Sequence, residues 1–171
     1  MGLLTFLTFL SFFSSAWGST LRSSVIIEAS PCVVSQSFNK GTANRIAWTL
    51  LAAKSSIRVA MYALTNPQLA DALIMSHARG VDVQAKMDNL QSAGKAQKVQ
   101  IERLRKEGVA IEISKLKRSQ HNKFAVVDGL LVITGSHNWT LNAENRNAEN
   151  AVFIQCAAVA DEFEKRWREI Q

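Results

Sequence analysis

The stretch from 121 to 140, HNKFAVVDGLLVITGSHNWT, carries polar side chains at both ends of an otherwise apolar sequence. His121 and Lys123 lie at its start, and Ser136 and Asn138 follow the second apolar run. An imidazole can act as a nucleophile or as a general acid and base. An ammonium group and an amide can bind the non-bridging oxygens of a phosphate diester. Since this set offers no obvious ligands for Mg²⁺, neutralisation of the substrate's charge would fall to the lysine and to hydrogen-bond donors.

The middle of this stretch predicts a hairpin, because Asp128 followed by glycine is a strong signal for a two-residue turn. The resulting register places Lys123 opposite Thr134. It places His121 opposite Ser136, on the same face as Lys123, because side chains alternate along a strand. The apolar residues between them would hold this polar cluster at the rim of the core. Asp128 has the wrong parity to join the cluster, and its first predicted role is in the turn.

The elements that must position this hairpin alternate between strand and helix along most of the chain. Alternating and apolar runs predict strands, and capping residues such as Asn66 before Pro67 predict helix starts. The pattern indicates an α/β fold in which helices flank a mixed β-sheet within a single domain. The predicted strands besides the hairpin span 30–36, 57–64, 81–87, 109–114 and 150–156, and the predicted helices span 42–56, 67–79, 93–107 and 157–170.

The N-terminal residues predict a secretory signal peptide. They are apolar from Leu3 to Phe13, and Ala16-Trp17-Gly18 fits a small-x-small cleavage site. Cleavage after Gly18 would leave 19–171 as a catalytic domain that is secreted or periplasmic and has no stable membrane association. The alternative is an uncleaved membrane anchor, although the apolar run is short for a span of about 20 residues.

The composition favours a polyanionic partner. The 171 residues carry a net charge of +6, which suits nucleic acid or an acidic membrane surface. The stretch SKLKRSQHNK at 114–123 has four basic residues and no acidic one, directly before and around His121. Cys32 and Cys156 could pair in an exported chain or remain separate buried thiols. The sequence offers no CxxC or HxxxH pattern and therefore no recognisable zinc site.

The spacing of the polar residues resembles the motif of the phospholipase D superfamily. The segment NAENAVFI resembles the region after that motif, where Glu149 would be the acidic residue that supports the catalytic histidine. The segment 53–83 resembles the family's first βαβ unit, and most of the chain resembles exported, plasmid-encoded endonucleases with a single motif. In this sequence the motif reads His121-x-Lys123-x4-Asp128-x6-Gly135-Ser136-x-Asn138.

The resemblance implies a two-step reaction without a metal or cofactor. His121 would attack phosphorus, and a second histidine would protonate the leaving oxygen before water releases the product. Lys123, Ser136 and Asn138 would contact the phosphate, and Asp128 and Glu149 would complete the catalytic set. Because this chain has one motif where the chemistry needs two, the resemblance also implies a homodimer.

Three functions remain open at this point. The leading hypothesis is a non-specific endonuclease acting on DNA or RNA through a phosphohistidine intermediate. The first alternative is a lipid hydrolase of the phospholipase D type, acting for example on cardiolipin, which a membrane anchor and an apolar rim would favour. The second is a catalytically inactive dimer that binds nucleic acid. The intact His121, Lys123 and Asn138 argue against this alternative.

Overall fold

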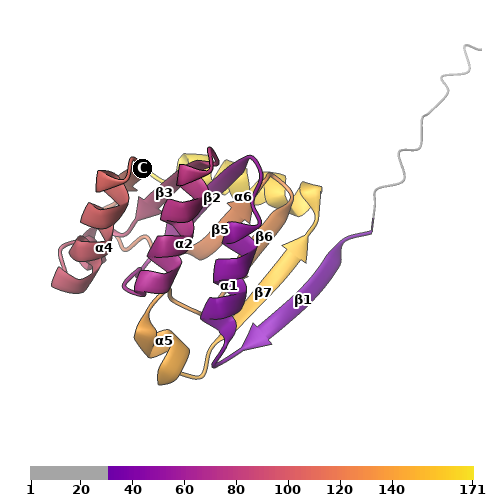
Figure 1. Ribbon diagram of the computed structural model, residues 1–171, viewed down its shortest axis with the longest axis horizontal. Helices are drawn as coiled ribbons and strands as arrows, with labels where there is room; N and C mark the ends of the chain where they lie inside the picture. The colour runs from indigo at the N-terminus through magenta and orange to yellow at the C-terminus, as the bar shows by residue number, and fades with distance from the viewer. Residues whose placement is uncertain (1–30) are drawn as a thin grey trace, which may run out of the picture.

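The structure is a computed structural model that describes residues 31–171 (Figure 1). The predicted signal peptide, residues 1–18, lies outside the described residues. Within them, seven strands form one mixed sheet in the order β1-β7-β6-β5-β2-β3-β4. The strands are β1 (Val33–Phe38), β2 (Ser56–Met61), β3 (Asp82–Met87), β4 (Ala110–Ile113), β5 (Lys123–Val127), β6 (Leu131–Gly135) and β7 (Asn150–Gln155).

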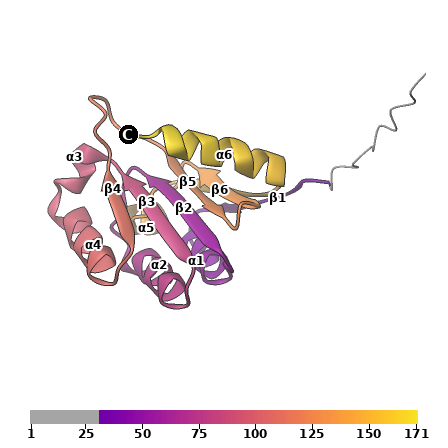
Figure 2. The same cartoon turned by 90° about the horizontal axis from the view of Figure 1, so that it is seen from above.

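Helices cover both faces of this sheet, which confirms the predicted α/β fold with a mixed sheet in one domain. Figure 2 shows α6 on the face opposite α1 and α2. Figure 1 shows the short α5 at the end of the sheet where β1 ends. The helices are α1 (Thr42–Leu51), α2 (Pro67–Ala78), α3 (Asn89–Ser92), α4 (Lys95–Lys106), α5 (Leu141–Asn145) and α6 (Ala157–Glu169).

Local signals account for the helix boundaries. The Asn66 side chain accepts a hydrogen bond from the Gln68 amide at 3.0 Å, and Pro67 occupies the first helical position of α2, as predicted. The helix predicted at 93–107 is confirmed as α4, but the short α3 that precedes it was not predicted. Asp88 caps α3 by accepting a hydrogen bond from the Gln91 amide, and Gly94 then begins α4 as a separate helix.

The core has two parts because strand side chains alternate between the faces of the sheet. Along β5, Ala125 and Val127 belong to the larger cluster, which also contains buried residues of α1, α2 and α4. Phe124 and Val126 belong to the smaller cluster beneath α6. Phe124 packs edge-to-face on Phe163 of α6, with ring centroids 5.0 Å apart. β5 is an inner strand that pairs with β2 on one side and with β6 on the other, so its first residue is held by the sheet.

The predicted register of the β5–β6 hairpin is wrong by one residue. Val127 pairs with Leu131, and Phe124, not Lys123, pairs with Thr134. The reason is Leu130, which stays outside the ladder while its carbonyl accepts a hydrogen bond from the Cys156 amide at 2.9 Å. Lys123 instead pairs with Met61 of β2. His121 lies ahead of β5, so its predicted pairing with Ser136 does not form.

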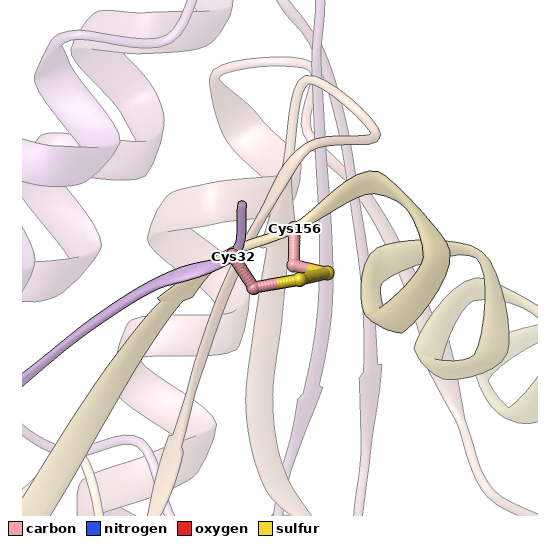
Figure 3. Close-up of a disulfide and its surroundings, with 2 residues drawn as sticks. All are labelled: Cys32 and Cys156. Atoms are coloured by element: carbon pink, nitrogen blue, oxygen red, sulfur yellow. A yellow bond between two sulfur atoms is a disulfide. The ribbon is translucent and has the colours of Figure 1, made fainter. Parts of the chain in front are cut away.

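Cys32 and Cys156 form a disulfide, which settles a pairing that the sequence left open (Figure 3). The register of β1 against β7 explains the contact. Val33 pairs with Gln155 in antiparallel strands, so the residues that flank this pair face each other. The bridge therefore fastens the edge strand β1 to the junction between β7 and α6.

Candidate active site

The motif residues other than Asp128 gather at one end of the sheet, where β2, β3 and β6 end and where β5 and β7 begin. His121 precedes β5, and its side chain is exposed at this end. The adjacent Asn122 carbonyl accepts a hydrogen bond from the Tyr62 amide at 2.8 Å, which fastens the segment to the end of β2. The main chain next to His121 is therefore held in place, while the imidazole itself is exposed to solvent.

The His121 and Lys123 side chains lie together, as their spacing predicts. The Lys123 Nζ atom is 3.1 Å from His121 Nδ1 and donates a hydrogen bond to the His121 carbonyl at 3.0 Å. Burial lowers the pKa of Lys123, and the negative charge of Glu149 partly opposes this shift. A half-buried ammonium beside an exposed imidazole can hold a phosphate oxygen while the ring approaches phosphorus.

Tyr62 is a member of the site that the motif did not include. Its ring centroid is 4.3 Å from that of His121, and Lys123 Nζ lies 5.1 Å from the centre of the Tyr62 ring. The Tyr62 hydroxyl accepts a hydrogen bond from Gln91 Nε2 at 2.8 Å. The tyrosine therefore forms a fixed wall against both motif side chains.

Ser136 and Glu149 form a second group at the same end of the sheet. The Ser136 hydroxyl donates to Glu149 Oε2 and accepts from the Asn150 amide at 3.1 Å. Asn147 Nδ2 donates to the other carboxylate oxygen at 2.9 Å. The Glu149 amide donates to Asn39 Oδ1 at 3.1 Å, so the acid is held from both its side chain and its main chain.

Glu149 therefore has a defined place, and its predicted support of the catalytic histidine stays a prediction. Among the described residues its carboxylate bonds are with Ser136 and Asn147. Its charge does reach Lys123, as the effect on the lysine pKa indicates. The predicted contact of Ser136 with substrate also stays a prediction, because its hydroxyl is bonded to the acid.

Gly135 explains why the motif requires glycine before Ser136. Its φ is +147°, a value that favours glycine, and a Cβ there would lie 2.4 Å from the Asn150 carbonyl oxygen. The absence of a side chain lets β6 approach β7 closely at this point. That approach brings Ser136 to Asn150 and Glu149.

Asn138 lies on a stretch that the structure anchors to the end of β2. The next residue, Trp139, is buried and donates its amide to the Ala63 carbonyl at 2.9 Å. Asn138 Oδ1 is buried and has no hydrogen-bond partner among residues 31–171. A buried amide oxygen without a partner is uncommon. Phosphate oxygens would need the Nδ2 donor and not this acceptor, so the predicted contact of Asn138 with substrate stays a prediction.

Asp128 lies at the opposite end of β5 and is not brought together with His121. Its carboxylate accepts hydrogen bonds from the Lys54, Ser55 and Ser56 amides at 2.8–3.1 Å. Burial raises the pKa of Asp128, but these amides outweigh it, so that the pKa lies below its usual value. The residue also adopts a left-handed φ of 55°. Its contacts are those of a side chain that holds the hairpin turn.

Three residues of this site besides Tyr62 were not predicted. They are Asn39, which holds the main chain of Glu149, and Asp88 and Gln120, which hold the main chain around His121. The bonds of Asn39 to Glu149 and of Asp88 to Gln120 join residues far apart in the chain, for which a single sequence carries no signal. Among residues 31–171, no group of three or more His, Cys, Asp or Glu side chains is arranged to hold a metal ion.

Comparison with known proteins places this geometry among relatives. Residues 46–170 match the family model described as cardiolipin synthase, PLD-like domain. A mitochondrial cardiolipin hydrolase of Xenopus tropicalis is 38% identical over 130 residues, covering 74% of this chain and 61% of that protein. A phospholipase D of Rickettsia bellii is 35% identical over 115 residues, covering 67% of this chain and 56% of that protein. The chain thus spans about three fifths of the length of these relatives.

Solved structures give the same fold. The crystal structure of a phospholipase D family member, Nuc from Salmonella typhimurium, superposes with a TM-score of 0.78 at 29% identity. The match covers 82% of this chain and 94% of that one. NucT from Helicobacter pylori shares the fold with a TM-score of 0.73 at 21% identity, over 82% of this chain and 96% of that one.

Proposed function

The chain belongs to the phospholipase D superfamily, and we propose that it is a phosphodiester hydrolase with His121 as its nucleophile. The observation that carries this proposal is the exposed imidazole whose Nδ1 lies 3.1 Å from the Lys123 ammonium. An exposed imidazole and a positive charge so close together can engage the same phosphate group. Tyr62 keeps both side chains in place from one side.

The proposed reaction has two displacements at phosphorus. A ring nitrogen of His121 attacks, a P–N bond forms, and the P–O bond to the leaving group breaks as a second imidazole gives that oxygen a proton. Water then attacks phosphorus, the second imidazole takes the proton from water, and the P–N bond breaks. Lys123 and Asn138 bind the non-bridging oxygens through both steps. The reaction needs no metal or cofactor, because the imidazoles and the lysine provide nucleophile, acid and charge.

We infer that the second imidazole comes from another copy of the chain. The sequence contains three histidines, and His121 is the one exposed at the site. His77 lies in the last turn of α2, at the other end of the sheet. His137 is buried with Nε2 3.5 Å from Glu144, and burial lowers its pKa although the Glu144 charge opposes this. We therefore propose a homodimer in which two His121 side chains face each other across the two-fold axis.

Mixed dimers test this arrangement. Equal amounts of wild-type and His121→Ala chains, once exchanged at random, give about a quarter wild-type dimers and half mixed dimers. A mixed dimer holds one His121 and lacks either the nucleophile or the acid. Activity per wild-type chain should therefore fall to roughly half. Full activity per wild-type chain after verified exchange would contradict the shared site.

Nucleic acid is the proposed substrate because of the loop that leads into His121. Lys115, Lys117 and Arg118 are exposed there, between β4 and the catalytic residue. The Lys115 amide donates to the Gln171 main-chain oxygen at 2.7 Å, so the base of the loop is anchored where Figure 2 shows it beside the C-terminus. Exposed positive charges next to the proposed phosphate-binding site suit a polyanion backbone, which carries no base information.

The salt dependence of binding tests the role of this loop. A Lys117→Ala, Arg118→Ala variant should lower the slope of log affinity against log salt by about 2 for duplex DNA, if both residues contact phosphates. The matched control removes two charges at the other end of the sheet, in a Lys54→Ala, Lys106→Ala variant, where both side chains are exposed. An unchanged slope in the loop variant, or an equal change in the control, would contradict the assignment.

We also propose that the protein is exported and acts in a secreted or periplasmic location. The apolar residues 1–18 support this proposal through their resemblance to a signal peptide. The Cys32–Cys156 disulfide supports it independently, since such bridges persist in oxidising compartments. Secreted protein should begin at Ser19 by N-terminal sequencing. A protein that keeps Met1 and stays in the membrane fraction would favour the anchor instead.

A lipid substrate is the second candidate, favoured by two apolar side chains near the site. Leu90 of α3 and Leu141 of α5 are 70% and 52% exposed, and both helices follow strands that end at the active-site edge. The relatives named mitochondrial cardiolipin hydrolase indicate cardiolipin as the lipid substrate of this alternative. No helix within residues 31–171 has the length and apolarity needed to cross a membrane.

One experiment separates these candidates. The protein is incubated in excess EDTA with plasmid, single-stranded DNA, RNA and cardiolipin vesicles. We expect cleavage of nucleic acid and little release of phosphatidic acid from the vesicles. Hydrolysis of cardiolipin alone would establish the lipid alternative. Binding of nucleic acid without cleavage of any substrate would indicate the inactive dimer, and cleavage that requires Mg²⁺ would refute the histidine mechanism.

A further inference from the structure

Two buried polar side chains that have no role in the proposed chemistry hold the main chain next to the nucleophile. Asp88, at the end of β3, and Gln120, which directly precedes His121, are each 1% exposed. Buried polar groups are costly unless their hydrogen bonds are satisfied. We call these two residues together the Asp88–Gln120 pair.

Asp88 joins α3 to the segment before His121. One carboxylate oxygen, Oδ1, accepts from the Gln91 amide at 2.9 Å and caps α3. The other, Oδ2, accepts from the Gln120 amide at 2.8 Å, across 32 positions in the sequence. A single buried carboxylate thus fixes two main-chain amides, and bonds to a charged acceptor are the stronger kind.

Gln120 continues this connection on the other side of the nucleophile. Its Oε1 atom accepts from the Asn122 amide at 2.7 Å, and its Nε2 atom donates to the Lys86 carbonyl at 3.1 Å. The residues before and after His121 are therefore both fixed to buried groups. Between them the imidazole alone projects to the surface.

The same connection reaches the wall of the site. The Asn122 carbonyl accepts from the Tyr62 amide, and the Tyr62 hydroxyl accepts from Gln91, whose amide Asp88 caps. The Tyr62 ring in turn contacts the His121 ring. These hydrogen bonds link the main chain on both sides of His121 to the Tyr62 side chain. Asp88 takes part twice, through the Gln120 amide and through the Gln91 amide.

We propose that Asp88 and Gln120 are positioning residues that set the direction in which His121 meets phosphorus. The proposal rests on the proposed function, since it concerns the attack by that imidazole. It assigns the pair no contact with substrate, because both side chains are buried. Orientation of a nucleophile contributes strongly to rate, and a misplacement of about 1 Å can cost about 100-fold.

Three substitutions separate positioning from simple stability. Asp88→Asn keeps the cap on α3, because Asn caps helices as well as Asp does, but presents an amide group to the Gln120 N–H. Gln120→Met keeps the length of the side chain and removes both of its bonds. Gln120→Glu keeps an oxygen for the Asn122 amide and loses the donor to Lys86. The control is Ser76→Ala, which removes a buried bond to the Leu50 carbonyl at the far end of α2.

The kinetic readout is hydrolysis of bis(p-nitrophenyl) phosphate, which is too small to touch the basic loop. We expect Asp88→Asn and Gln120→Met to lower kcat about 10- to 100-fold with KM within about threefold of wild type. Gln120→Glu should recover part of the loss, and Ser76→Ala should leave kcat unchanged. An unchanged kcat in folded Gln120→Met, or a loss that the control shares, would overturn the proposal.

Hydrogen exchange gives a readout that does not depend on activity. The Asn122 amide should be protected in the wild type and should exchange about three- to tenfold faster in Gln120→Met, because it loses the acceptor. Ser76→Ala should leave its exchange unchanged. Equal protection in Gln120→Met and wild type would overturn the proposed positioning. A wild type that hydrolyses no phosphodiester would overturn the proposed function while this measurement still decides whether the pair holds the segment.

Discussion

Replacement of Asp128 by alanine should destabilise the protein by about 2–3 kcal/mol and leave the chemistry of each folded molecule nearly unchanged. The lost carboxylate accepts from three main-chain amides and from the Ser55 hydroxyl. These bonds lie near the surface, so we count about 1–2 kcal/mol for the set instead of the full value for buried bonds. The left-handed φ of 55° adds about 1 kcal/mol, because Ala disfavours that region more than Asp does.

Thermal denaturation and a small-substrate assay measure the two effects separately. A loss of about 2–3 kcal/mol corresponds to a fall in Tm of roughly 4–12 °C for a chain of this size. Asp128→Asn keeps the turn preference and one acceptor, and should lose less. Because the folded pKa of Asp128 is lowered, its contribution is present above the unfolded pKa of about 4 and is lost as pH falls through the folded value. A kcat reduced 100-fold at unchanged Tm would refute this reasoning and restore Asp128 to the catalytic set.

Three further predictions concern the disulfide and the motif. Replacing Cys32 and Cys156 by serine opens a loop of 124 positions, and in the chain-entropy model should cost about 5 kcal/mol in denaturant unfolding, whereas equal midpoints would refute the bridge. Because burial lowers the pKa of Lys123, its ammonium loses its proton below the usual lysine pKa of 10.5, so kcat/KM should begin to fall with rising pH before that value is reached; a Lys123→Arg profile without this fall is the control. Gly135→Ala would place a methyl group 2.4 Å from the Asn150 carbonyl oxygen, so folded material should show at least tenfold lower kcat, and wild-type activity and Tm together would contradict the close approach.

The order of the strands and of the four longer helices was predictable because each of them carries its own local signal, whereas the short α3 and α5 were not predicted. Alternating side chains mark β3, and Asn66 with Pro67 marks the start of α2. The motif spacing predicted that His121 and Lys123 lie together, and their side chains do meet, although His121 precedes β5 and does not share the strand with Lys123. These predictions depend on neighbours in the sequence, and the structure agrees with them.

The parts that could not be predicted depend on contacts across the sheet. The observed hairpin register differs from the predicted one by one residue, because Leu130 stays outside the ladder. Its carbonyl accepts a hydrogen bond from the Cys156 amide, which lies outside the hairpin. The bond between Ser136 and Glu149 depends on how closely Gly135 lets β6 approach β7. The role of Asp88 depends on a segment 32 positions away. No periodicity or spacing within one sequence encodes such pairings.

The measurement that tests the central claim most directly is detection of a phosphorylated His121. The protein is mixed with substrate, quenched rapidly in base, where phosphohistidine survives, and digested for mass spectrometry. We predict a phosphate-ester adduct on the peptide that contains His121, its disappearance on a chase without substrate, and its absence in His121→Ala, which should also lose activity at least 1,000-fold. Substrate cleavage without any adduct, together with substantial activity in His121→Ala, would contradict the account.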